Sequence, residues 1–386
     1  MIIPEEFDDI RPYTDEEMPE QMSKLLEDEE FIQTLRYIYA DIPIEKVIET
    51  IRKCRNAYEF QSVCVYPVIQ QLLGKVSEGL EGDFTSVADL NTNPHTFVSN
   101  HRDIVLDSAL LDTLLIDNGA NTAEIAIGDN LLIKPWIRQF VRINKSFIVQ
   151  RSLSPRLLLM ASAKMSRYMH FAVSEKKENI WIAQREGRAK DSNDRTQESV
   201  LKMMAIGGTG NIIDRLKNLN IVPLTLSYEY DPCDYLKAKE FQMKRDIPGF
   251  KKSKQDDLDN MRIGIFGRKG HIHFHAAPCI NDWLDTLDPD TPKNELMSTI
   301  AHHIDHQIHL GYKLYPANYV AADMLLDATT YADRYTEEEA ETFKKYLNER
   351  LSMIELPEPD TSFLRERLLT MYANPTFNKA TAEKEK

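Results

Sequence analysis

The sequence predicts an α/β domain that lies between two helical regions. Between about residues 87 and 290, short apolar runs alternate with stretches of helical length. This alternation is typical of a sheet that helices bury on both faces. On either side of this stretch, helical spacing and helix-start signals recur, which indicates helices. We therefore expect a mixed sheet flanked by helices, with helical regions at both ends of the chain.

The N-terminal part divides into two segments. Residues 1–20 are acidic and have no helical periodicity, so we expect a flexible acidic tail there. From residue 21 to residue 86 the spacing is helical, and the chain should form an N-terminal helical domain. The apolar residues that recur at three- and four-residue intervals are Leu25, Leu26, Phe31, Ile32, Leu35 and Ile38.

Six apolar runs in residues 87–290 have the length of strands. They are "HTFVSN", "AEIAIG", "SFIVQR", "IWIAQR", "NIVPLTLSYE" and "GHIHFHAAP". A functional site should lie where these strands end, because loops there present side chains over a rigid sheet. Pro223 lies inside the fifth run, where it removes a ladder donor and favours a sheet edge, a strand end or a bulge.

After residue 290 the pattern becomes helical again. Residues 291–378 should form a C-terminal helical region, in which "TEEE", Thr336 to Glu339, reads as a capping box. The tail "KATAEKEK", residues 379–386, is polar and should be disordered.

Charge excludes one class of partner and suggests another. Lysine and arginine number 47 and aspartate and glutamate 61, so the net charge is −14, which argues against nonspecific binding of nucleic acid. Between Leu131 and Ser174, however, there is no acidic residue. This basic belt indicates an anionic partner, such as a phosphate or an anionic membrane surface, or a solvated face whose counter-charges lie elsewhere in the fold. The belt contains Lys134, Arg138, Arg142, Lys145, Arg151, Arg156, Lys164 and Arg167.

The compartment follows from cysteine use and hydropathy. Cys54, Cys64, Cys233 and Cys279 fit neither a zinc site nor a redox pair, so four reduced thiols are expected. The N-terminus lacks the order of a signal peptide, and no apolar run approaches the roughly 20 residues that cross a bilayer. We expect a cytoplasmic protein, peripheral on the inner face of the cytoplasmic membrane.

The stretch "FVSNHRDIVLD", Phe97 to Asp107, is the first candidate site. His101 follows an apolar run, and Asp103 and Asp107 follow the histidine at two and six positions. A carboxylate that orients a histidine at a strand end is an arrangement for general-base chemistry. The same letters also fit an ordinary strand-to-helix turn capped by Asp103.

Two later strands end in arginine. "SFIVQRS" ends at Arg151, and "IWIAQREGRAKD" ends in a loop that contains Glu186, Gly187 and Arg188. Arginine binds phosphate through two parallel hydrogen bonds, and a glycine lets the backbone approach a ligand closely. Ordinary surface arginines at strand ends are the alternative.

Taken in order, these pieces resemble the four sequence blocks of the glycerolipid acyltransferase family. The corresponding segments here are "NHRDIVLD", "FIVQRS", "REGRAKD" and "IVPLTLSYE", and the resemblance extends from about residue 94 to residue 330. "HRD", "LSYE" and "KLYPANYVAADMLL" are similar to the glycerol-3-phosphate and dihydroxyacetone-phosphate branch. In the family, aspartate follows histidine by five positions. Aligning the final "LD" selects Asp107, with one inserted residue.

The resemblance implies a fold, a reaction and roles for residues. It implies the family's mixed sheet and an O-acyltransferase of phospholipid biosynthesis, which moves a fatty acyl group from acyl-CoA or acyl carrier protein to a glycerol-phosphate acceptor. The acceptor would be glycerol-3-phosphate or 1-acylglycerol-3-phosphate, and no cofactor or metal is needed. His101 would be the base and Asp107 its partner. The phosphate would be bound by Arg151, Glu186, Gly187 and Arg188, and Pro223 would shape the pocket.

Two further expectations follow. His101, Arg151 and Arg188 should share one cavity. The helix "LLIKPWIRQFVR" should either pack on the sheet or lie at a lipid interface. Two rival functions also remain open. One is a catalytically silent lipid-binding or scaffold protein on the same fold. The other is a metallohydrolase that uses His271, His273 and His275, three histidines without an acid nearby in the sequence.

Overall fold

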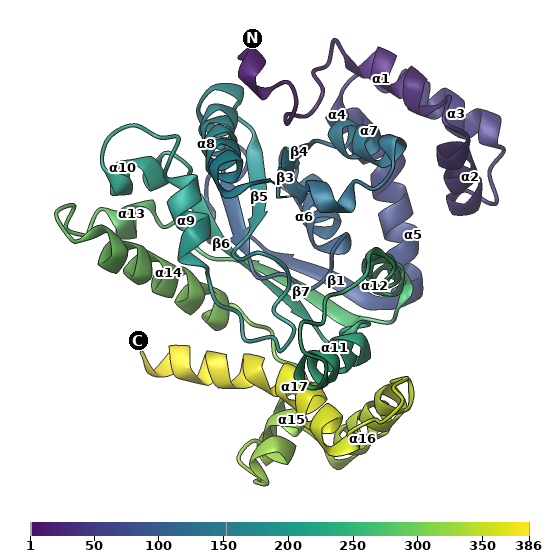
Figure 1. The fold of residues 1–386 in the computed structure, drawn as a ribbon, viewed down its shortest axis with the longest axis vertical. Helices are drawn as coiled ribbons and strands as arrows, with labels where there is room; N and C mark the ends of the chain where they lie inside the picture. Colours follow the sequence, from purple (N-terminus) through teal and green to yellow (C-terminus); the bar gives the residue numbers. More distant parts are fainter. Residues whose placement is uncertain (1, 152, 386) are drawn as a thin grey trace.

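A seven-stranded mixed sheet forms the centre of the computed structural model, which describes residues 2–151 and 153–385 (Figure 1). The strand order is β1-β7-β6-β2-β5-β3-β4. The strands are β1 (Ser77–Asp83), β2 (Thr96–Ser99), β3 (Ala123–Gly128), β4 (Ser146–Val149), β5 (Asn179–Ala183), β6 (Ile221–Tyr228) and β7 (Gly270–Ala276).

The strand directions bring five carboxyl ends to one edge of the sheet. β2 pairs in parallel with both β5 and β6, and β3 pairs in parallel with both β5 and β4. β7 runs antiparallel to β6, and β1 runs parallel to β7. The loops that follow β2 to β6 therefore lie along the same rim, which we call the carboxyl edge.

The six predicted strands are confirmed, and a seventh escaped prediction. β1 has the sequence "SEGLEGD", which lacks the apolar alternation of a half-buried strand. It lies at the end of the sheet order, pairs with β7 alone among the described strands and is exposed or half-buried throughout. Its pairing with β7 forms the strand, since its own side chains bury little apolar surface. The segment 77–83 therefore belongs to the sheet and not to the N-terminal helical domain.

The N-terminal part is mostly helical, and a short 3₁₀ turn precedes its first α-helix. Its elements are η1 (Glu5–Phe7), α1 (Met18–Leu25), α2 (Glu29–Ile38), α3 (Ile44–Lys53), α4 (Ala57–Phe60), η2 (Gln61–Val65) and α5 (Tyr66–Val76). The prediction of a flexible tail over residues 1–20 is wrong for the described residues. Phe7 and Ile10 are buried in the main core, and the carbonyl of Ile10 accepts from Ile148 N–H on edge strand β4 at 2.9 Å.

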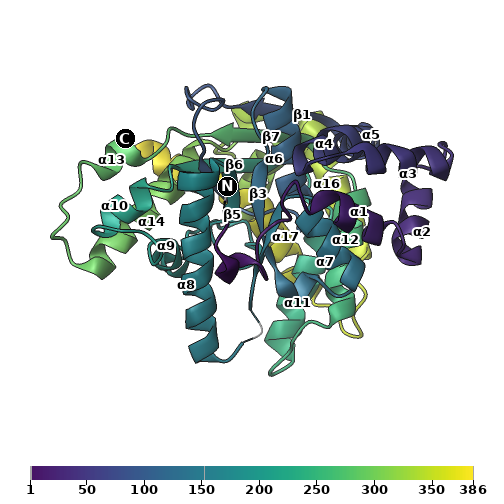
Figure 2. The same ribbon diagram turned by 90° about the horizontal axis from the view of Figure 1, so that it is seen from above.

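Helices cover both faces of the sheet (Figures 1 and 2). α8, α9 and α14 bury one face, and α5 and α6 bury the other. The helical elements of this middle part are α6 (Leu106–Asp117), η3 (Asp129–Leu131), α7 (Pro135–Ile143), α8 (Pro155–Phe171), η4 (Ala172–Lys176), α9 (Glu198–Met204), α10 (Ile212–Lys217), α11 (Asp234–Asp246), α12 (Lys254–Phe266) and α13 (Asn281–Leu284). The two buried faces make the molecule the layered α/β structure that the alternation predicts.

The C-terminal region begins with α14, which covers the sheet, and continues as helices that pack together beside it. It contains α14 (Lys293–Leu310), α15 (Pro316–Leu326), η5 (Ala332–Arg334), α16 (Glu337–Ser352) and α17 (Thr361–Lys384). The capping box at Thr336 is confirmed, since its side chain accepts from Glu339 N–H. The expected disorder of residues 379–386 is wrong for most of that tail, because α17 continues to Lys384 and Ala382 is buried. Among the described residues, no helix is both long enough and apolar enough to cross a bilayer.

Five of the eight cations of the basic belt contact the N-terminal part of the chain, three of them through ion pairs. Lys134 pairs with Glu30 at 2.8 Å, Lys164 with Asp9 at 2.8 Å and Arg167 with Glu6 at 2.6 Å. Arg138 and Arg142 donate to backbone carbonyls of residues 8, 9 and 11. The belt is therefore largely an internal docking surface for the chain's own acidic start.

Aromatic side chains of the N-terminal helices cover the apolar stripe of α7. Trp136 and Phe140 pack against Phe31 with ring centroids 5.7 and 6.1 Å apart, and Phe60 packs edge-on against Phe140. The helix predicted to pack on the sheet or at a lipid interface instead joins the N-terminal helices to β4.

Candidate active site

The loop after β2 begins with a side chain that extends the strand pairing. Asn100 is buried, and its Oδ1 accepts from Leu226 N–H at 2.7 Å while its Nδ2 donates to the Leu226 carbonyl at 2.9 Å. The amide thus occupies the place of a further backbone pair between β2 and β6. This contact fixes the chain at the carboxyl edge immediately before His101.

Asp103 and Asp107 have separate roles. Oδ1 of Asp103 accepts from the backbone N–H groups of Val105 and Leu106 at 2.9 and 2.8 Å, which closes the turn that starts α6. Asp107 lies one turn further on, and its Oδ2 is 2.7 Å from Nδ1 of His101. Asp107 is therefore the acid that contacts His101, and Asp103 closes the turn that leads into α6, whereas general-base chemistry at His101 stays a prediction.

Three donors hold the carboxylate of Asp107. Besides His101, the N–H of Arg102 donates to Oδ2 at 2.6 Å and the phenol of Tyr228 donates to Oδ1 at 2.9 Å. Burial, followed by the charge of Asp107, raises the pKa of Tyr228 well above its ordinary value, so the phenol keeps its proton. Since the carboxylate is buried and can only accept, the histidine nitrogen that faces it must carry hydrogen.

The other ring nitrogen of His101 is left free. With Nδ1 protonated, neutral imidazole has its lone pair on Nε2, and no residue in the described part of the chain is hydrogen-bonded to Nε2. The side chain is 13 % exposed. Trp181 of β5 packs edge-on against the ring with centroids 5.6 Å apart, and its indole N–H donates to Ser99 Oγ at 3.0 Å. The imidazole is therefore oriented on one side and accessible on the other.

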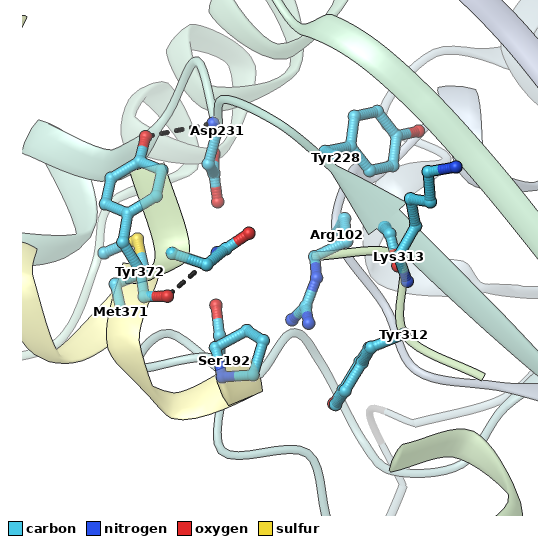
Figure 3. A pocket seen from close by; sticks show the side chains of 11 residues that line it. Arg102, Ser192, Tyr228, Asp231, Tyr312, Lys313, Met371 and Tyr372 are labelled. Carbon is cyan, nitrogen blue, oxygen red and sulfur yellow. Dashed lines mark hydrogen bonds between the residues drawn. The ribbon is translucent and has the colours of Figure 1, made fainter. Parts of the chain in front are cut away.

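A buried ionic network lies on the far side of the loop. Arg102 donates to both carboxylate oxygens of Asp194, at 3.2 and 2.6 Å, and Tyr312 donates to the same carboxylate. Figure 3 shows Arg102 and Asp231 pointing into a cavity that Tyr228 and Tyr312 also line. The volume of this cavity is about 30 Å³. That volume holds one or two waters and no acyl chain. These buried contacts hold the loop in place on the side of Arg102.

Arg188 lies beneath α12. Its Nη2 donates to Asn260 Oδ1 at 3.0 Å, while its Nη1 is buried without a hydrogen-bond partner in the described part of the chain. Although burial favours the neutral form, Cys233, Asp231 and Asp103 hold the pKa of Arg188 above its ordinary value. A buried guanidinium with an unused donor is a group that an anionic ligand would satisfy.

Arg151 and Glu186 form a second, exposed pair. Their nearest side-chain atoms are 3.7 Å apart, and the side chains are 37 % and 74 % exposed. A Cβ on Gly128, the last residue of β3, would lie 2.9 Å from Nε of Arg151. Arg151 therefore leans across the end of β3 toward the loop after β5. In that loop Gly187 has φ +67°, a left-handed conformation that glycine adopts without strain.

Pro223 is not at the carboxyl edge. It is buried inside β6 in register with Val98, and His101 follows Val98 by three residues, or about 10 Å along the strand. Of the three alternatives for Pro223, the sheet edge is wrong, since β6 lies between β7 and β2. The carbonyl of Pro223 accepts from Ala277 N–H, one residue past the end of β7, so the missing donor faces the point where that ladder stops.

The structure brings the other predicted residues to one edge without joining them in one cavity. His101 follows β2, Glu186, Gly187 and Arg188 follow β5, and Arg151 follows β4. β4 is three strands from β2, or about 14 Å at the usual spacing. The expected shared cavity is not found among the hollows of the described residues. A larger hollow of about 330 Å³ lies at the opposite edge, between Asn93, Lys177 and Asn220.

The late histidines do have acids near them, supplied by other strands. His271 lies within metal-ligand reach of Glu78 and Glu229, and His275 Nδ1 is 3.2 Å from Asp83 Oδ2. Glu78 also pairs with Arg268 at 2.7 Å, and the group is largely exposed. Sequence spacing missed these neighbours because β1 escaped prediction.

Several residues of the site escaped sequence reasoning. Tyr228, Trp181 and Arg102 contact the His101–Asp107 pair, and Gly128 makes room for Arg151. A signal existed for Tyr228, which ends its strand in "LSYE", and for Gly128, which ends "AEIAIG". Trp181 carries no such signal, because an aromatic residue inside a strand is ordinary core.

Comparison with known proteins adds no assignment. No protein-family model matches the chain, and no curated protein matches it.

Proposed function

We propose that the protein is an O-acyltransferase that moves a fatty acyl group from acyl-CoA or acyl carrier protein to the hydroxyl of a glycerol-phosphate acceptor. The observation that carries this proposal is the His101–Asp107 pair at the carboxyl edge, with Nδ1 tied to a buried carboxylate and Nε2 accessible. A histidine held in this tautomer is suited to remove a proton from a hydroxyl group.

The reaction needs one proton relay. Nε2 of His101 takes the hydroxyl proton of the acceptor while the oxygen attacks the thioester carbonyl. Asp107, which three donors hold in place, stabilises the imidazolium that forms. When the tetrahedral intermediate collapses, the carbon–sulfur bond breaks and the imidazolium returns the proton to the thiolate that leaves.

The acceptor's phosphate would be bound along the same edge. The unused Nη1 of Arg188 and the exposed guanidinium of Arg151 are the two arginine donors that the resemblance assigns to this role. Arg185 also has a buried Nε without a partner among the described residues. It adds a third guanidinium, in the loop after β5 that also contains Arg188. Glycerol-3-phosphate and 1-acylglycerol-3-phosphate are the acceptors we propose, within phospholipid biosynthesis. We place the protein on the inner face of the cytoplasmic membrane.

A thiol-release assay tests the proposal. Purified protein receives acyl-CoA or acyl carrier protein together with a panel of phosphorylated alcohols, and free thiol is measured over time. We expect release that depends on the acceptor, and a loss of about 10²- to 10⁴-fold in His101→Ala, because a general base contributes that much. His302→Ala is the matched control, since His302 is 65 % exposed on α14 and, within the described part of the chain, pairs only with Glu385.

Three outcomes would reject the proposal. Undiminished turnover in His101→Ala would remove the base. Binding of acyl chains without turnover would favour the silent lipid-binding protein. Loss of activity with a chelator would favour a metal-dependent reaction at the late histidines.

A further inference from the structure

The N-terminal end of α8 carries an exposed apolar surface that the proposed chemistry does not use. Figure 2 shows this end of α8 standing away from the neighbouring helices. Every described residue from 153 to 160 is exposed, and five of these residues are large and apolar. They form the apolar tip, which consists of Leu153, Leu157, Leu158, Leu159 and Met160, with exposed fractions of 36, 49, 40, 66 and 61 %.

The tip is apolar on all sides. Residues 157–160 are consecutive, and at 3.6 residues per turn they point in four directions around the helix axis. A helix that packs on a protein surface needs only one apolar stripe, whereas a helix that is apolar all round is surrounded by apolar material. A protruding helix end of this kind fits a fluid apolar environment, which can contact it on all sides.

The charge near the tip favours an anionic surface. Arg156 lies inside the tip sequence and has no ion-pair partner in the described part of the chain, and Arg151, which pairs with Glu186 at 3.7 Å, precedes the tip. No acidic residue occurs between Leu131 and Ser174, although the whole chain carries −14. Five other cations of the belt are already bound by the N-terminal segment, so the tip is where positive charge stays available.

We propose that the apolar tip of α8 docks the protein on an anionic lipid bilayer. The leucines and Met160 enter the acyl region, while Arg156 contacts lipid phosphates. A second copy of the chain is a poorer occupant, because stable protein interfaces use about 20–30 residues a side and the tip offers five. The docking deepens the proposed function, since Arg151 joins the tip to the carboxyl edge and a membrane-borne acyl lipid would arrive beside it.

Vesicle sedimentation of the full chain tests the docking. We expect binding to phosphatidylcholine vesicles that contain phosphatidylglycerol, weaker binding to phosphatidylcholine alone, and further weakening by salt. Leu159→Gln with Met160→Gln should lower the partition coefficient by about 100-fold or more, since burial of each of the two side chains is worth at least about tenfold. Arg156→Gln should cost about fivefold on anionic vesicles only.

A matched pair of exposed apolar residues provides the control. Leu326 and Met353 are 53 % and 45 % exposed on the C-terminal helices, and their double change to Gln should leave vesicle binding intact. Equal binding of the tip variant and the wild type, or no binding of the wild type to either vesicle, would overturn the docking. Self-association in solution that the tip variant abolishes, without vesicle binding, would assign the tip to a second copy.

His101→Asn separates the docking from the proposed reaction. This variant should bind anionic vesicles as the wild type does while thiol release is lost. Vesicle binding without acyl transfer by the wild type would reject the reaction and leave the docking in place, whereas acyl transfer without vesicle binding would reject the docking alone.

Discussion

Asp103 and Asp107 lie four residues apart, and their surroundings give them different hydrogen-bond partners. Asp103 is satisfied by backbone donors and lies against α12, and burial, together with the nearby Asp107, raises its pKa. Asp107 meets a histidine, a phenol and a backbone N–H. The sequence could show that two carboxylates follow His101. It could not show which one the imidazole faces, because that depends on where α6 begins.

The two aspartates can be distinguished by matched substitutions. Asp107→Asn should lower acyl transfer by about 10²- to 10⁴-fold, because an amide can donate to Nδ1 and favours the wrong tautomer. Asp103→Asn keeps an oxygen that can accept from Val105 and Leu106, so its effect on thiol release should be much smaller. Thiol release and urea unfolding are measured for both. The reverse order of activity losses would mean that Asp103 is the partner.

At the scale of elements, α12 packs closely against the β2–α6 loop because Gly264 has no side chain at the contact. Glycine inside a helix costs roughly 1 kcal/mol relative to alanine. At Gly264, however, a Cβ would lie 2.2 Å from Asp103 Oδ2. The helix can therefore lie directly on the β2–α6 loop, where its Asn260 also binds Arg188. This packing is invisible in the sequence, since a glycine in a helical pattern signals a weak helix and names no partner.

A glycine pair tests this packing. Gly264→Ala should destabilise the protein by about 1–3 kcal/mol, because the added methyl must displace the helix or the carboxylate. Gly74 is exposed on α5, and nothing lies within 4 Å of the Cβ that alanine would add. Gly74→Ala should therefore be neutral or stabilise the protein by up to about 1 kcal/mol. Urea midpoints measure both. Gly264→Ala as stable as the wild type would show that α12 shifts without cost.

At the scale of the whole molecule, buried titratable groups link distant parts of the chain. Asp112 of α6 accepts from Ala123 N–H at 2.8 Å and from Gln61 Nε2 at 3.1 Å, which joins α6 to β3 and to η2. Burial raises its pKa to about 7, against the opposing effects of Ala123 N–H and Lys145. The folded state therefore favours the neutral acid, and this stabilisation is complete below about pH 4 and lost as the pH rises through 7.

The pH dependence of unfolding should show this group. Between pH 4 and pH 8 the charge of Asp112 should cost up to about 4 kcal/mol, or about 1.36 kcal/mol for each unit of raised pKa. His303 acts in the opposite sense, because burial lowers its pKa to about 4. The free energy of unfolding is therefore compared between wild type and Asp112→Asn at each pH. A difference that does not change from pH 4 to pH 8 would contradict the assignment.

The sequence by itself determined the layered α/β fold, six of the seven strands and the placing of His101 and three later charged residues beyond strand ends. It did so because strands buried on both faces appear in the sequence as apolar runs, and helices appear as apolar residues at three- and four-residue intervals. Only the tertiary structure decided which acid faces His101, that β1 completes the sheet, that the acidic N-terminus covers the basic belt, and that Pro223 lies away from the edge. Those outcomes depend on contacts between residues distant in the chain, and such contacts leave no local pattern.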